Sequence, residues 1–171
     1  MGTNQRSQVA MTEEEIASFI EQSRTATLAT IGPSGTPHLV AMWYAVLDGQ
    51  IWIETKGRSQ KALNIGRDDR VTVSIEDGFT YDKLRGVSIE GRGVIVDDPD
   101  RLWKVGVGVW ERYSGPYTEE VQPLVEFMLH KRVAVRIDVE RVRSWDHRKL
   151  GLAPVPLDGS TAPHLERLPP V

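Results

Sequence analysis

The chain has 171 residues, 21 of them basic and 24 acidic, so it is long enough for one domain with a sizeable core and carries a net charge of −3. This near balance of charge provides no global positive field for nucleic acid, and any anion site must be local. Cysteine is absent, which excludes disulfides and thiolate zinc sites and means that a redox role requires a bound cofactor.

The N-terminal segment, residues 1–11, is mostly polar and is predicted to be a disordered lead. It lacks the features of a signal peptide, and no apolar run in the chain approaches the length that crosses a bilayer. We therefore expect a cytoplasmic protein that does not contact a membrane. A first helix is predicted from Thr12 to Gln22, because Thr12 and Glu15 have the spacing of a capping box. This helix is expected to cover one end of a barrel.

Alternating apolar residues predict several strands, and turn-forming residues separate the first of them. Gly32-Pro-Ser-Gly35 closes one hairpin, and Asp48-Gly49 suits the positive φ angles of another tight turn. Most connections are short, which favours antiparallel pairing in a closed or nearly closed barrel over a doubly wound parallel sheet. The predicted strands are residues 25–31, 37–46, 51–56, 71–75, 86–96 and 132–142.

Two helices are predicted between the last two strands. The first begins at Asp97-Asp-Pro-Asp100, and its Gly106 and Gly108 would allow close approach of another backbone. The second begins at Thr118 and carries one apolar stripe that needs a partner surface. Five of the ten prolines lie in residues 150–171, which are expected to form an irregular tail, with a position along a neighbouring subunit left open. Residues 12–149 are then the single folded domain.

Three cations, Lys56, Arg58 and Lys61, lie where the strand 51–56 ends and a helix is predicted to begin at Ser59. Backbone N–H groups at a helix start, with basic side chains beside them, favour anion binding. Spacing alone is equally compatible with a solvated corner between a strand and a helix.

Several common chemistries have no support in the sequence. Ser34 lacks the spacing of a nucleophile elbow, and the four histidines are too scattered for a helical metal site. No Gly-x-Gly-x-x-Gly motif follows a strand, and no eight-residue phosphate loop occurs. Neither a hydrolase, nor a metal site, nor a Rossmann nicotinamide site is therefore expected.

The segment from Glu54 to Ile65 resembles the phosphate-binding segment of the pyridoxamine phosphate oxidase-like, flavin-binding split-barrel proteins. Ala29–Val40 and Met42-Trp-Tyr44 resemble the actinobacterial branch of that superfamily, whose members often use the deazaflavin coenzyme F420. The resemblance covers roughly residues 12–149. It implies an α+β fold built on an antiparallel split β-barrel, and a homodimer with two equivalent cofactor sites between the subunits.

Positions matching the family motifs supply the expected cofactor site. Lys61 stands at the phosphate-binding lysine, Ser59 and Thr55 stand at positions that contact phosphate and tail, and the strand from His38 to Trp43 would run beside the ring. Trp145, after the last strand, would reach the partner's pocket. The full expected set is His38, Leu39, Val40, Ala41, Met42, Trp43, Glu54, Thr55, Lys56, Arg58, Ser59, Gln60, Lys61 and Trp145.

This chain departs from the flavin oxidases at particular positions. Gln60 stands where they carry an arginine, Gly86 stands where they often have a glutamine near the ring, and their C-terminal Arg-x-His clamp is missing. Oxidation of pyridoxamine phosphate itself is therefore not expected. Lys56 and Arg58 lie outward of Lys61, where they would serve the carboxylates of the F420 tail, and Gly86 would leave room near the ring.

The resemblance, together with these departures, implies an F420-dependent reductase that acts on an electron-poor small molecule. His38 and Tyr44 could each donate a proton, but no residue is assigned as catalytic. Two alternatives remain open: an FMN-dependent oxidase or reductase, and a non-enzymatic carrier of the cofactor or of a haem or other tetrapyrrole.

Overall fold

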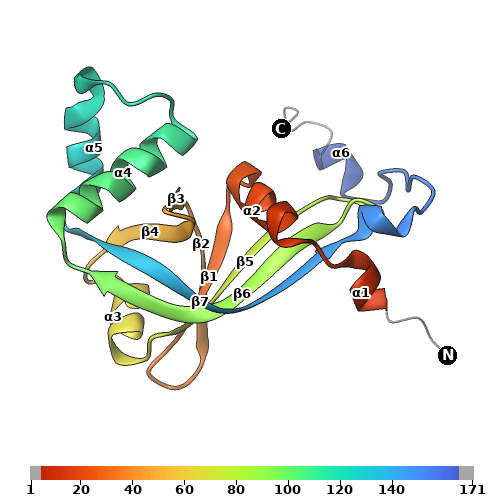
Figure 1. The fold of residues 1–171 in the computed structure, drawn as a ribbon, viewed down its shortest axis with the longest axis horizontal. Helices are drawn as coiled ribbons and strands as arrows, with labels where there is room; N and C mark the ends of the chain where they lie inside the picture. Colours follow the sequence, from red (N-terminus) through yellow and green to blue (C-terminus); the bar gives the residue numbers. More distant parts are fainter. Residues whose placement is uncertain (1–4, 166–171) are drawn as a thin grey trace.

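The computed structural model describes residues 5–165, and these residues form one curled antiparallel sheet with helices on its flanks (Figure 1). The seven strands are ordered β2-β1-β5-β6-β7-β4-β3. The predicted antiparallel split β-barrel with α+β content is therefore confirmed. The strands are β1 (Ala26–Ile31), β2 (Pro37–Met42), β3 (Ala45–Leu47), β4 (Gln50–Lys56), β5 (Arg70–Asp77), β6 (Arg85–Val96) and β7 (Arg132–Asp146).

The strand predicted for residues 37–46 is broken in the structure at Trp43 and Tyr44. The two pieces, β2 and β3, lie at opposite edges of the sheet, so these two residues carry the chain from one edge to the other. The apolar run from Leu39 to Leu47 continues through the break, and neither Gly nor Pro marks it, so the sequence pattern could not reveal it. The junction brings the two edges of the sheet together.

The predicted turn between β3 and β4 is confirmed. Asp48 and Gly49 have φ angles of 54° and 73°, which are the left-handed values that a tight hairpin turn requires. The hairpin between β1 and β2 is confirmed as well, with Ile31 opposite Pro37.

Strand β7 is longer than predicted and continues through Trp145 to Asp146. It pairs with β4 near Arg132 and with β6 along the rest of its length, where Trp145 lies opposite Gly86. A Cβ atom on Gly86 would collide with the indole of Trp145 and lie 2.8 Å from the carbonyl oxygen of Ile75. The space that the sequence offered at Gly86 is therefore filled by Trp145 of the same chain.

Two apolar cores lie on the two faces of the sheet. The larger fills the barrel and includes Leu28, Ile53, Val73 and Ile137, with Phe19 of α2 (Glu13–Gln22) against it. The smaller joins Trp52 and Ala134 of the sheet to Val105 and Val109 of α4 (Pro99–Tyr113). Alternate residues of β4 enter opposite cores, as the strand period requires.

The predicted helices are present, and the first two have side-chain caps. The Thr12 hydroxyl accepts from Glu15 N–H while the Glu15 side chain accepts from Thr12 N–H, and the Asp98 carboxylate caps α4. The helix predicted from Thr118 instead begins as a 3-10 turn at Glu119 and becomes α-helical only from Gln122, without a side-chain cap. The space beside Gly106 is taken by the side chain of Leu129, and Ala45 and Leu47 of β3 lie against Gly108, so both glycines allow close packing on α4. The remaining helices are α3 (Gln60–Arg67), the 3-10 turn η1 (Glu119–Val121), α5 (Gln122–Leu129), the 3-10 turn η2 (His147–Leu150) and α6 (Ala162–Leu165).

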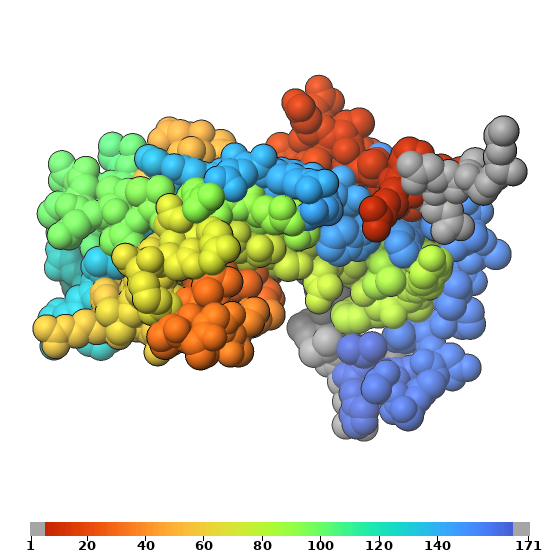
Figure 2. Space-filling model, turned by 90° about the horizontal axis from the view of Figure 1, so that it is seen from below, coloured from red at the N-terminus to blue at the C-terminus, as the bar shows by residue number. Residues whose placement is uncertain are grey.

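The segments outside the predicted domain include two short helices. Residues Gln5–Val9 form α1 within the segment expected to be disordered, and α6 interrupts the tail expected to be irregular. Figure 2 shows α3 and α4 at one end of an elongated molecule and residues 150–165 at the other. Throughout residues 5–165, no helix is long and apolar enough to cross a membrane.

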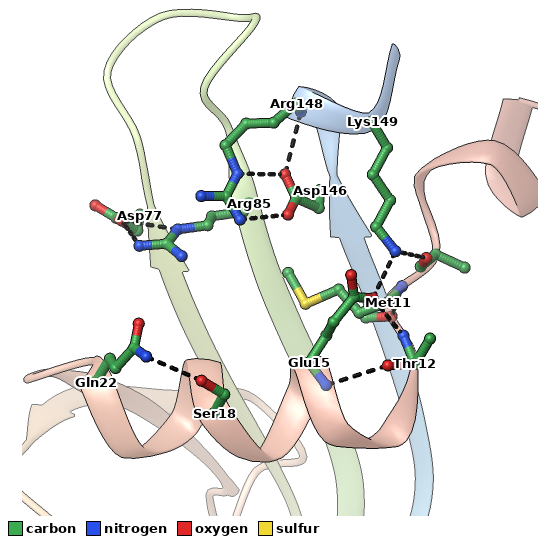
Figure 3. Close-up of polar contacts among 12 residues, drawn as sticks. Met11, Thr12, Glu15, Ser18, Gln22, Asp77, Arg85, Asp146, Arg148 and Lys149 are labelled. Carbon is green, nitrogen blue, oxygen red and sulfur yellow. Dashed lines mark hydrogen bonds and ion pairs between the residues drawn. The ribbon is translucent and has the colours of Figure 1, made fainter. Parts of the chain in front are cut away.

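One ion pair attaches α2 to the 3-10 turn that follows β7, beside two other ion pairs at this end of the sheet (Figure 3). Lys149 donates to the Glu15 carboxylate at 2.5 Å, and Arg148 pairs with Asp146 at 2.6 Å beside the pair of Arg85 and Asp77. The hollow of about 360 Å³ among these groups has four charged side chains in its lining that already form ion pairs: Glu15, Arg85, Asp146 and Arg148. The rest of the lining is Met11, Glu14, Ser18, Phe19 and Gln22. We regard this cluster as structural.

Candidate functional site

An ammonium and two hydroxyls meet where β4 ends and α3 begins. Lys61 Nζ donates to Thr55 Oγ1 at 3.1 Å, and Thr55 Oγ1 lies 3.1 Å from Ser59 Oγ. Ser59 also caps α3, since its hydroxyl accepts from Ala62 N–H. We call Thr55, Ser59 and Lys61 the anion nest, because an ammonium, two hydroxyls and a helix start converge there.

Helix α3 is held in place by a buried amide. Asn64 Nδ2 donates to Thr30 Oγ1 of β1 at 3.0 Å, and Asn64 Oδ1 accepts from Gln60 and from Arg67. This arrangement fixes the first turn of α3, and with it Lys61, against the barrel. It also turns the Gln60 side chain along the helix toward Asn64.

An arginine that the sequence did not single out completes the positive cluster. Arg132 begins β7, and its register opposite Lys56 brings its guanidinium within 2.6 Å of the buried Glu54 carboxylate. Lys56 Nζ instead donates to the carbonyl oxygen of His130 at 2.9 Å. The guanidinium near the nest therefore comes from the last strand, whereas Arg58 is exposed.

The electrostatics of the cluster favour a bound anion. Burial lowers the pKa of the Lys61 ammonium, and the neighbouring Arg132 lowers it further. Burial raises the pKa of the Glu54 carboxyl, while Arg132 opposes that shift. Among the described residues Lys61 has no carboxylate at ion-pair distance, so an anion in the nest would stabilise its charged form.

A cleft of about 370 Å³ opens beside this cluster. Its lining combines residues of the segment 38–43, which was predicted to run beside the cofactor ring, with residues from elsewhere in the chain. Trp43 in this lining is 55% exposed and stacks on Tyr113 of α4, with the ring centroids 4.4 Å apart. The lining residues are Ala41, Met42, Trp43, Glu54, Met128 and Arg132.

The cleft gathers only part of the expected set. His38, Leu39 and Val40 lie further along β2 and do not line it, and the buried Nδ1 of His38 has no hydrogen-bond partner. Trp145 lies at the opposite end of β7 from Arg132. Within one protomer, therefore, Trp145 and the anion nest are separate.

Tyr44 is placed in the barrel core, and only Trp43 of this neighbouring pair faces the cleft. The Tyr44 hydroxyl donates toward the carbonyl oxygen of Ile20 at 2.6 Å and accepts from Arg112 at 3.0 Å. Burial raises its pKa to about 12. A phenol held in this way is not available as a proton donor to the cleft.

The residues present fit a phosphate-bearing planar cofactor. The nest offers an ammonium and two hydroxyls to a phosphate, and the indole and thioethers of the cleft offer apolar walls to a ring. Arg132 is the donor that sequence reasoning missed. The sequence did place Arg132 at the first residue of a predicted strand. Only the pairing of β7 with β4, however, shows that this residue lies beside Glu54.

Comparisons with known proteins agree with this reading of the fold. A family model described as pyridoxamine 5'-phosphate oxidase matches residues 12–146. The F420H(2)-dependent biliverdin reductase of Mycobacterium tuberculosis is 27% identical over 132 residues, which are 75% of this chain and 85% of that protein. The crystal structure of the conserved hypothetical protein Rv2991 from M. tuberculosis is 62% identical with a TM-score of 0.90, covering 93% of this chain and 99% of that chain. A structure named F420 reductase is 27% identical with a TM-score of 0.58, over 77% and 98% of the two chains.

Proposed function

The chain belongs to the pyridoxamine 5'-phosphate oxidase family, and from this membership we propose that it is a coenzyme F420H2-dependent reductase of an electron-poor organic acceptor. The observation that carries the proposal is the anion nest, in which Lys61 donates to Thr55 beside the helix cap Ser59. Its donors suit the phosphate that such a cofactor carries. The relatives named as F420-dependent reductases support the choice of cofactor.

Each part of the site has a role in this proposal. When bound, a reduced deazaflavin supplies the hydride. Lys61, Ser59 and Thr55 hold the phosphate, Lys56 and Arg58 meet the anionic tail, and the cleft walls exclude water from the ring. We retain the expected cofactor-binding set of His38, Leu39, Val40, Ala41, Met42, Trp43, Glu54, Thr55, Lys56, Arg58, Ser59, Gln60, Lys61 and Trp145, and we add Arg132.

The preference for F420 over FMN rests on where the cations lie. FMN ends in one phosphate, whereas the F420 tail continues into carboxylates that need donors further out. Arg58 is exposed beyond the nest, and Lys131 lies next to Arg132 on the same rim with its side chain exposed. The space once expected at Gly86 no longer supports the choice, because Trp145 fills it.

We also propose that residues 12–149 form the cofactor-binding domain of a homodimer. Several large apolar side chains are exposed in the protomer, including Phe127 at 83% and Leu39 at 62%. A second copy would cover such residues and would bring its Trp145 toward a site from which the protomer's own Trp145 is remote. Light scattering at micromolar concentration should give the mass of a dimer, and a cofactor-bound monomer would contradict the proposal.

Fluorescence titration of the apo-protein with F420 and with FMN in one buffer tests the cofactor. F420 should bind more tightly. Reduced F420 should then be consumed when a quinone, an enone or a tetrapyrrole is added. Each turnover would transfer one hydride from the cofactor and one proton to the acceptor. Tighter binding of FMN would favour a flavin oxidoreductase instead, and tight binding of F420 without turnover of any acceptor would favour a carrier.

A further inference from the structure

Two buried polar atoms beside the cleft have no hydrogen-bond partner. They are Oε2 of Glu54 and Nε of Arg132. The Glu54 side chain is only 8% exposed, and its Oε2 lies 2.6 Å from Arg132 Nη1 without the geometry of a hydrogen bond. Because buried polar groups are normally hydrogen-bonded, this pair is incompletely satisfied in the protein alone.

The charges of this pair exclude simple ions as its ligand. A carboxylate acceptor and a guanidinium donor lie side by side, so the pair has no net charge. An anion would be repelled by Glu54 and is better served by Lys61, while a cation would be repelled by Arg132. A neutral group that presents both a donor and an acceptor would satisfy both partners.

The walls around the pair indicate the shape of that ligand. Trp43 presents an indole that is supported from behind by its stack on Tyr113. Met42 and Met128 supply flexible thioethers to the same cleft. Such walls suit the faces of a flat conjugated ring.

We infer that Glu54 and Arg132 together recognise the cis-amide edge, an N–H beside a C=O, of a neutral planar heterocycle bound in the cleft. The ring N–H donates to the Glu54 carboxylate, and the ring carbonyl accepts from the Arg132 guanidinium. Since Arg132 Nε is enclosed in the protein alone, the guanidinium must turn toward the ligand. The inference rests on the proposed function, because the pyrimidinedione of a flavin or deazaflavin has such an edge. Lys61 would then recognise the phosphate of the cofactor, and Glu54 and Arg132 would recognise its ring.

A pair of phosphate-free ligands tests the inference without turnover. The probes are 8-hydroxy-5-deazariboflavin and its N3-methyl derivative, in which the edge N–H is blocked, with binding followed by fluorescence. The protein should bind the unmethylated ring roughly ten- to a hundredfold more tightly, as expected for a hydrogen bond to a charged group. The double variant Glu54→Leu/Arg132→Met should lose this discrimination, and it avoids leaving one buried charge unpaired.

Three further variants separate this role from steric and structural ones. Glu54→Gln keeps the side-chain shape, so it should reduce the discrimination if the carboxylate accepts the N–H and preserve it if the methyl group merely collides. Arg136→Met/Asp138→Leu removes another ion pair of β7 and should leave the discrimination intact. Lys61→Met should weaken F420 binding but not binding of the phosphate-free ring.

The possible results separate the inference from the proposed function. Equal binding of the two rings, full discrimination in the double variant, or no measurable ring binding would each overturn the inference. If F420 still bound in a Lys61-dependent manner, the proposed function would stand even though the inference about Glu54 and Arg132 had failed. Loss of F420 binding altogether would instead remove the proposed function.

Discussion

The indole of Trp145 occupies the space that a side chain at Gly86 would need, on the neighbouring strand of the same chain. Gly86→Ala must therefore displace either Trp145 or the β6 backbone near the Ile75 carbonyl. We expect a loss of about 1–3 kcal/mol in the free energy of unfolding, as for other overpacked sites, measured by urea denaturation. Tryptophan fluorescence should shift as well.

A matched glycine provides the control for this change. Gly66 lies in α3 with no heavy atom within 4 Å of an added Cβ. Gly66→Ala should stabilise the protein by roughly 0.5–1 kcal/mol through helix propensity. The steric cause predicts that Gly86→Ala costs less stability in a Trp145→Ala background than in the parent, whereas an unchanged Gly86→Ala protein would refute it.

Lys61→Ala should weaken F420 binding more than any other single change among the cations of the strand-to-helix segment. A charge-assisted contact to phosphate contributes roughly 1.5–3 kcal/mol, which corresponds to about ten- to a hundredfold in affinity. Lys56→Ala and Arg58→Ala should affect F420 more than FMN, because they lie toward the tail. Lys104→Ala, an exposed change on α4, is the control. Equal binding by all of these proteins would mean that the site is misassigned.

Tyr44→Phe should change the response of the protein to alkali. The folded-state pKa of Tyr44 is raised from its usual 10.0 to about 12, so the phenol stabilises the fold below pH 10 and this contribution is lost as pH rises toward 12. The variant should be less stable at neutral pH by about 1–3 kcal/mol, yet lose less of its stability over that interval. Unfolding curves at a series of pH values measure both effects. Tyr81→Phe, on a ring that is 58% exposed, serves as the control.

Arg148→Met should flatten the response of stability to acid. Hydrogen bonds from Arg148 lower the pKa of Asp146, so the carboxylate stabilises the fold above its unfolded pKa, and this contribution disappears as pH falls through the lower folded value. Without Arg148, the stability of the protein should decline less between neutral and acidic pH. Urea denaturation across that range measures the slope, with Arg58→Met as a control outside this ion-pair cluster. Parallel slopes for parent and Arg148→Met would contradict the expectation.

Helix caps and tight turns could be predicted from local sequence, whereas features that depend on strand pairing could not. The caps at Thr12, Ser59 and Asp98 and the turn at Asp48-Gly49 follow from residue type and spacing alone, and the structure has them. The break at Trp43 depends on where the sheet edges meet, which strand alternation does not encode. Sequence patterns also placed Trp145 beyond the last strand. The residues around Trp145 are mostly charged and do not show the apolar alternation of a strand, although β7 pairs with β6 as far as Asp146.

The candidate site likewise has a part that local sequence predicts and a part that depends on strand pairing. Thr55, Ser59 and Lys61 lie within seven residues, so their convergence could be predicted from one strand end and one helix cap. Arg132 could not be found in this way, since its contact with Glu54 depends on the register between strands that are distant in sequence. The role predicted for Trp145 in a partner's pocket stays a prediction.

The position of β4 between β3 and β7 has a consequence for biosynthesis. During translation β4 emerges with only its short hairpin partner β3, and the strand that covers its other edge, β7, begins at Arg132. Until that residue leaves the ribosome, the backbone of β4 offers unpaired N–H and C=O groups to any neighbouring nascent chain. A ribosome that stalls within the α4–α5 segment would thus hold a chain in which this edge of β4, with Glu54 and Thr55, is still unpaired.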